Sequence, residues 1–112
     1  MPDTLQLSVD SSTVYAGLAL SREGQLLAEH TWRAERDHSR TLMPAIVHLL
    51  ATHHAQPQDI GSLAVATGPG SFNGLRVGLS VIKGLALALK APVAGVSTLA
   101  VAAFAHAASG LQ

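Results

Sequence analysis

The sequence has 112 residues, of which 48% are apolar and 12% are charged, and seven Lys and Arg balance seven Asp and Glu. This length is typical of one domain. The share of charged residues is about half of the roughly 25% typical of soluble domains. We therefore expect exposed apolar surface that is covered by a partner or by a further part of the protein. The absence of cysteine excludes disulfides, thiolate catalysis and cysteine–zinc sites, and the scattered basic residues form no patch that would bind RNA by itself.

The sequence predicts a soluble, cytoplasmic protein. Its first residues lack the basic and apolar segments of a signal peptide. Its longest apolar stretch, residues 75–89, is interrupted by Arg76, Ser80 and Lys83. That stretch is also shorter than the roughly 20 residues that cross a bilayer, so we expect no membrane contact.

The first third of the sequence predicts three strands. Apolar residues alternate at Leu5, Leu7 and Val9, which is the period of a strand with one buried face. Turn-forming residues follow at 11–13 and again at 22–24. Connections this short join antiparallel neighbours. We therefore expect an antiparallel meander with strands over 4–10, 14–20 and 25–33.

Helices and strands alternate in the rest of the sequence. A helix should start with Asp37 or Ser39 as its N-cap, and Pro44 lies beyond the first turn, where we expect a local irregularity. The later elements are a strand over 62–67, a helix over 72–90, a strand over 93–96 and a helix from Ser97 to about Ala108. Strand–helix–strand connections are right-handed and join parallel strands. The order βββαβαβα predicts one α/β domain over 1–112 with a mixed sheet.

The first turn is one of two loops that could contact a phosphate group. It contains Asp10, Ser11, Ser12 and Thr13. A carboxylate at a strand end, beside hydroxyls and backbone N–H groups, can hold a metal–phosphate group. In the alternative, these side chains only satisfy the backbone of a hairpin turn, and the spacing alone favours that alternative.

The second loop contains Gly68, Gly70, Ser71 and Gly74, between a buried strand and a helix. Glycines there let backbone N–H groups approach an anion at the positive end of the helix. The spacing matches neither the dinucleotide-binding fingerprint nor the Walker A loop. A strained turn that needs glycine for its backbone angles is an equal alternative, and the sequence leaves the two open.

The helix over 72–90 is apolar almost all round, with a narrow polar seam at Arg76, Ser80, Lys83 and Lys90. A helix on one sheet needs only an apolar stripe, so we expect a partner to cover the rest; complete burial inside the domain is the alternative. Gly78 would permit close helix packing, and Gly78→Glu should break association while sparing most of the fold. The expected subunit interface comprises Met43, Val47, Ala51, Arg76, Val77, Gly78, Val81, Leu85 and Ala88.

No metal site or catalytic group can be assigned from the sequence. His48, His53 and His54 are close together, but their spacings do not place them on one helical face, and no HExxH motif is present. Serines are plentiful, and none is singled out as a nucleophile by a histidine and an aspartate. We therefore expect no catalytic residue, no metal and no cofactor.

Four segments together resemble one family: LSVDSSTVYAGLAL, HSRTLMPAIVHLL, LAVATGPGSFNGLRVGLSVIKGLALAL and PVAGVSTL. They are similar, in the expected order over residues 5–99, to the TsaB/YeaZ family of tRNA threonylcarbamoyladenosine biosynthesis. The motif GPGSF-x-GLRVG-x-S-x-x-KGLA is highly specific to this family. Asn73 stands where the family usually has Thr, and the sequence ends near the close of what is normally the first of two similar domains.

The resemblance implies an actin-like ATPase domain of the ribonuclease-H-like class, in which residues 10–13 form a degenerate phosphate loop. It implies a non-catalytic scaffold or activator that pairs with a TsaD-like catalytic subunit through the helices matching 39–54 and 72–89. A TsaE-like ATPase would be a further partner, self-association is also expected, and tRNA would be contacted only indirectly. The alternative is a nucleotide-dependent enzyme or a glycoprotease-like peptidase that uses Asp10 and the 68–74 loop.

Overall fold

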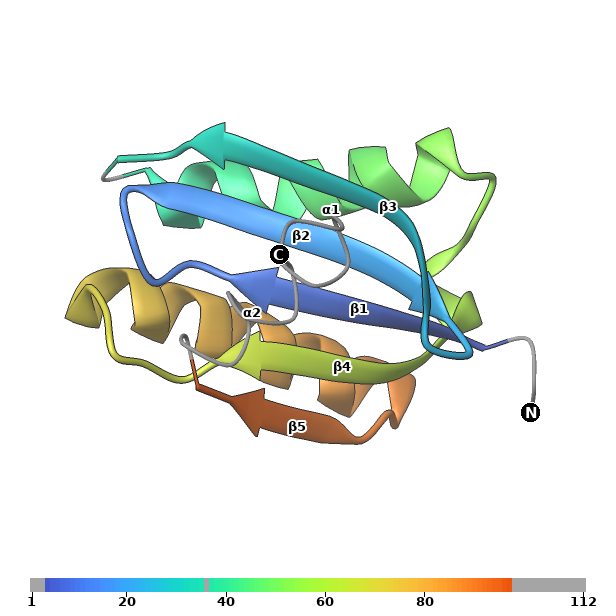
Figure 1. Cartoon of the computed structure of the whole chain (residues 1–112). Coiled ribbons are helices and arrows are strands. Elements are labelled where there is room, and N and C mark those ends of the chain that lie inside the picture. The colour runs from blue at the N-terminus through green and yellow to red at the C-terminus, as the bar shows by residue number, and fades with distance from the viewer. Residues whose placement is uncertain (1–3, 36, 98–112) are drawn as a thin grey trace, which may run out of the picture.

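The chain forms a five-stranded mixed sheet, and helices cover one face of it (Figure 1). The computed structural model describes residues 4–35 and 37–97. The elements in chain order are β1 (Leu5–Asp10), β2 (Tyr15–Arg22), β3 (Gln25–Arg33), α1 (His38–Thr52), the 3-10 helix η1 (Pro57–Asp59), β4 (Ile60–Ala66), α2 (Phe72–Leu89) and β5 (Val93–Val96). The strand order is β3-β2-β1-β4-β5, with antiparallel pairing from β3 to β1 and parallel pairing from β1 to β5.

Alternating side chains of the central strands build the core against the helices. Leu7 of β1 is opposite Leu20 of β2, and both are fully buried. The period of two places every second side chain on the same face of the sheet, which explains why β1 alternates buried and half-buried residues. The helices complete the core cluster with Leu42, Ile46, Leu49, Leu50 and Ile82.

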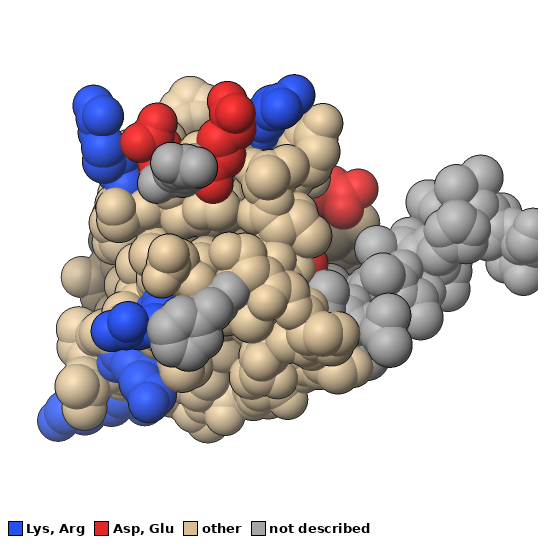
Figure 2. Space-filling view, turned by 90° about the vertical axis from the view of Figure 1, so that its left-hand side faces the viewer, with Lys and Arg blue, Asp and Glu red and all other residues tan. Residues whose placement is uncertain are grey.

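Charged side chains are unevenly distributed at the end of the molecule where α1 and α2 begin (Figure 2). Asp and Glu lie beside Lys and Arg at the top of this view, whereas the lower left, on the side of α2, shows Lys and Arg without acidic neighbours. Two exposed ion pairs, Arg33–Glu35 and Arg40–Asp37, both at 3.9 Å, lie at the corner between β3 and α1.

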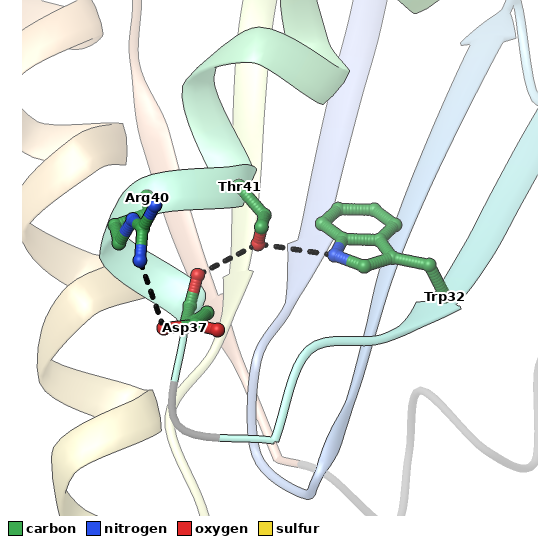
Figure 3. A network of polar contacts seen from close by, with 4 residues as sticks. All are labelled: Trp32, Asp37, Arg40 and Thr41. Atoms are coloured by element: carbon green, nitrogen blue, oxygen red, sulfur yellow. Dashed lines mark hydrogen bonds and ion pairs between the residues drawn. The ribbon is translucent and has the colours of Figure 1, made fainter.

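A polar network fixes the start of α1 against the edge strand β3 (Figure 3). Trp32 Nε1 donates to Thr41 Oγ1 at 3.1 Å, and the same hydroxyl donates to the Asp37 carbonyl at 2.8 Å. The accompanying pair of Arg40 with Asp37 is exposed, and such pairs contribute little stability. The two hydrogen bonds therefore hold the first turn of α1 beside the last residues of β3.

The expected α/β class, the meander and the parallel pairs are confirmed. Helix α1 has Asp37 as its N-cap residue, although that side chain makes no capping hydrogen bond. Pro44 does not interrupt α1, which runs from His38 to Thr52. The Arg40 carbonyl loses its helical donor there, and because Arg40 and Pro44 are both exposed, water can replace it. The expected last helix lies outside the described residues, apart from Ser97. No helix of the described part is long and apolar enough to span a bilayer.

Candidate functional site

The β1–β2 turn is held together by hydrogen bonds between its own residues. The Asp10 carboxylate accepts, through Oδ1, the backbone N–H of Ser12 at 3.0 Å and the Ser12 hydroxyl at 2.6 Å. Ser11 and Ser12 are 0% and 1% exposed. A carboxylate that satisfies its own turn in this way matches the hairpin alternative. The geometry therefore favours a structural role for Asp10.

The glycine-rich loop lies against this turn. Gly68 adopts a φ of 126°, which strongly favours glycine. The Ser71 N–H donates to the Ser12 carbonyl at 2.6 Å, and the Gly74 N–H donates to Ser71 Oγ at 3.4 Å. The buried Ser11 hydroxyl donates to the Gly74 carbonyl at 2.6 Å. Two N–H groups that an anion at the start of α2 would use are therefore already bonded within the chain.

Three glycines make room for the turn. Gly74 and Gly78 lie four residues apart on one side of α2, and Gly70 precedes the N-cap Ser71 in the loop. A Cβ at Gly70 would collide with the Ser12 carbonyl, one at Gly74 with the Ser11 carbonyl, and one at Gly78 with the Ser11 hydroxyl. The turn thus fills the space through which an anion would approach this side of α2, which supports the structural alternative for the loop.

His38 joins the same turn to α1. It is the first residue of α1 and is only 5% exposed. Its Nε2 lies 2.8 Å from the Thr13 carbonyl, and because a carbonyl only accepts, Nε2 carries the proton. The two residues are 25 positions apart, so no local pattern in the sequence indicates this contact. The β1–β2 turn is therefore clamped to the first turns of both helices.

Only some of the residues predicted to form the subunit interface are exposed. Met43 and Val47 of α1 are 39% and 55% exposed, and Ala51 is exposed as well. On α2, Arg76 and Ala88 are also exposed. We call these five residues, which lie on two helices that pack side by side, the helical face.

The remaining interface residues contact their own domain. Val77, Val81 and Leu85 are half-buried and pack against the core. Gly78 is buried beneath Ser11, so its assignment to the interface is wrong, and so is the expectation that Gly78→Glu would spare the fold. The sheet, the β1–β2 turn and α1 together cover more of α2 than the single side expected from the sequence. Contacts within the domain therefore cover part of the apolar surface of α2 that the sequence analysis assigned to a partner.

Two adjoining clefts lie between the amino-terminal ends of α1 and α2. Their volumes are about 410 and 430 Å³, and Ser39, Asn73 and Val77 line both. The first cleft also contains His38, whose Nε2 is used by the β1–β2 turn, and the exposed Glu35. Among the described lining residues, no hydroxyl is hydrogen-bonded to a base. Nor do three His, Asp or Glu side chains of the described part lie together as a metal site would require.

Comparisons with known proteins place these features in a family. Residues 30–111 match the family model described as "TsaD: tRNA N6-adenosine threonylcarbamoyltransferase". The chain is 40% identical over 93 residues to a tRNA threonylcarbamoyladenosine biosynthesis protein TsaB of Bacillus subtilis, across 83% of this chain and 41% of that protein. YeaZ from Pseudomonas aeruginosa matches with a TM-score of 0.85 and 35% identity, across 96% of this chain and 50% of that one. The chain thus spans half or less of these relatives.

A more distant structure supports the fold class. A Bacteroides thetaiotaomicron protein with an actin-like ATPase fold matches with a TM-score of 0.56 at 8% identity, across 84% of this chain and 33% of that one. At such low identity the likeness concerns the fold alone, and it confirms the expected class. The agreement of sequence and structure with TsaB and YeaZ proteins shows that the chain belongs to the TsaB/YeaZ family.

Proposed function

We propose that the chain is a non-catalytic subunit for tRNA threonylcarbamoyladenosine formation, which binds a TsaD-like catalytic subunit through the helical face. The observation that carries the proposal is the exposure of Met43 and Val47, at 39% and 55%, on the outer side of α1. Exposed large apolar side chains that are grouped together mark protein contacts. The relatives named as biosynthesis proteins for this modification support the choice of pathway.

The β1–β2 turn supports the non-catalytic part of the proposal. An active phosphate loop needs polar groups that are available to a nucleotide. Here the Asp10 carboxylate is bonded to Ser12, and the Ser12 carbonyl is bonded to Ser71. Opening this turn would break these partly buried hydrogen bonds, each of which stabilises the fold by about 1 kcal/mol. The alternative of a nucleotide-dependent enzyme or a glycoprotease-like peptidase gains no support from this geometry.

Other parts of the proposal rest on the resemblance to the family. They are a TsaE-like ATPase as a further partner, only indirect contact with tRNA, self-association and a cytoplasmic location. We also propose that residues 1–112 correspond to the first of two similar domains, because the chain covers 41% of the Bacillus subtilis relative.

Calorimetric titration of the chain with the TsaD-like subunit of the same organism tests the docking. Val47→Glu should weaken binding at least about tenfold, because an unpaired charge would be buried at the contact. Leu27→Glu is the matched control: Leu27 is 41% exposed, but it lies on β3, outside the helical face. Circular dichroism of both variants checks the fold. Wild-type affinity of a folded Val47→Glu variant would contradict the proposal.

A further inference from the structure

Strand β3 forms one edge of the described sheet. It lies at the end of the strand order and, among the described strands, pairs only with β2 (Figure 1). It is nine residues long, and all of them except Ala28 and Trp32 are exposed. Natural edge strands are commonly protected by Lys, by Pro or by a bulge. β3 contains neither Lys nor Pro, and its register shift lies near Leu27, so residues 28–33 form a regular edge.

The backbone groups of alternate residues face outward along this edge. The Ala34 N–H donates to the Val14 carbonyl at 2.8 Å, one position beyond the last pair of β2 with β3. Hydrogen-bonded pairs alternate along an antiparallel ladder, so every second residue from Trp32 back to Ala28 is bonded to β2. The N–H and C=O groups that face away from β2 are therefore those of Glu29, Thr31 and Arg33.

We propose that a second copy of this chain pairs with β3 edge to edge, as an antiparallel strand related by a two-fold axis at Thr31. In this register Thr31 lies opposite Thr31 of the second copy, and Glu29 lies opposite Arg33. The inference specifies the surface used for the self-association proposed above, and it leaves the helical face to the TsaD-like subunit. An interface between two identical edges is closed, so association stops at the dimer.

The charges of β3 select this register. The two-fold axis must pass through a residue whose backbone groups face outward. An axis at Glu29 or at Arg33 would place a like charge opposite itself, which is unfavourable. An axis at Thr31 places Glu29 opposite Arg33 at both ends of the contact, and cross-strand pairs of opposite charge and of Thr with Thr are both stabilising. The edge of β3 is therefore complementary to itself.

The side chains on the two faces of β3 are compatible with this pairing. Trp32 packs against the core on the helix side, so the period of two places Glu29 and Arg33 on the opposite face, where both are exposed. Neither described ion pair includes Glu29, and Arg33 has only the exposed contact with Glu35, at 3.9 Å. On the helix side, Trp32 would lie opposite His30 of the second copy, and aromatic pairs also stabilise adjacent strands.

Sedimentation of the chain over a range of concentrations tests the inference through Thr31. We expect the wild type to form a dimer at high concentration. Thr31→Pro removes the central outward N–H but no hydrogen bond to β2, and Pro is tolerated at such edge positions, so this variant should be a monomer. The matched control Thr31→Val keeps the N–H and should still form the dimer. Circular dichroism checks the fold of both variants.

Charge reversal tests the register and does not depend on the folding of the Pro variant. Glu29→Arg and Arg33→Glu each replace both cross-strand pairs by like charges, so each should weaken self-association at least about tenfold. An equimolar mixture of these two variants restores opposite charges at both ends of the contact. The mixture should therefore form a dimer at a concentration where each variant alone is a monomer.

The outcomes separate this inference from the proposed function. A wild-type dimer that Val47→Glu dissociates, and that Thr31→Pro and the charge reversals leave intact, would assign self-association to the helical face and overturn pairing through β3. A wild type that stays a monomer would refute self-association and this inference together, without affecting docking to the TsaD-like subunit. Loss of binding to that subunit in Thr31→Pro, with no wild-type dimer, would assign the edge to a different protein. A mixture of the two reversed variants that stays monomeric would refute the register.

Discussion

Replacing Gly74 by alanine should destabilise the chain, although alanine normally stabilises a helix. An added Cβ would collide with the backbone carbonyl of Ser11, and no flexible side chain can move away to relieve that contact. The Ser11 hydroxyl is at the same time bonded to the Gly74 carbonyl at 2.6 Å. The added methyl group must therefore displace the whole β1–β2 turn.

Three contributions set the size of the effect. Alanine gains up to about 1 kcal/mol of helix propensity over glycine. Overpacking a tight contact costs about 1–3 kcal/mol, and loss of the buried Ser11 hydrogen bond costs about 1–3 kcal/mol more. With the full propensity gain these contributions give a net loss of about 1–5 kcal/mol in the free energy of unfolding, which is a large part of the 5–15 kcal/mol typical of a domain.

Urea unfolding followed by the fluorescence of Trp32, the single tryptophan, measures this loss. Gly84→Ala on the same helix is the control: nothing lies within 4 Å of its added Cβ, so this variant should be as stable as the wild type or more stable. In Gly78→Ala the collision is with the Ser11 hydroxyl, so adding Ser11→Ala should relieve it, whereas the same addition should not rescue Gly74→Ala. Equal stability of Gly74→Ala and Gly84→Ala would refute the packing argument.

Two further predictions concern the network at α1 and the closed turn. Thr41→Val should cost about 1–2 kcal/mol of unfolding free energy because it leaves the Trp32 N–H without its acceptor, whereas Arg40→Ala should cost less than about 0.5 kcal/mol; urea unfolding compares them, and equal losses would count against the network in Figure 3. Calorimetric titration with ATP and Mg²⁺ should show no tight binding, because Asp10 and the start of α2 are bonded within the chain. Micromolar affinity would contradict the structural role of the turn.

The strands were predictable from the sequence because their pattern is local. Alternation at Leu5, Leu7 and Val9, with short turns on either side, specifies both the strand and its antiparallel neighbour. The start of α1 at His38 agrees with Asp37, one of the two N-caps that the sequence predicts, whereas β4 begins at Ile60 and not at residue 62, because the ends of elements are the least determined by a local pattern. The contact of His38 with Thr13 was beyond prediction, since it depends on how α1 docks on the sheet.

The role of Gly78 shows where reasoning from composition fails. A small residue in a helix permits close approach, but the sequence does not state whether the approaching group is a partner helix or the chain's own turn. The four-residue spacing of Gly74 and Gly78 places them on one side of α2, and the apolar Ile82 continues that side into the core. The direction of each side chain on the helix, rather than the number of apolar residues, separates the buried side of α2 from its exposed side.

Protection of a single introduced cysteine tests the central claim, docking through the helical face, most directly. The chain has no cysteine, so Val47→Cys and Leu27→Cys each create one reactive thiol on a background without others. The rate of alkylation of each variant is followed by mass spectrometry, with and without saturating TsaD-like subunit. The account predicts that the partner slows alkylation at residue 47 at least about tenfold and leaves residue 27 unchanged, because a buried thiol is shielded from the reagent. Equal reactivity at residue 47 in the saturated complex and in the free chain would contradict it.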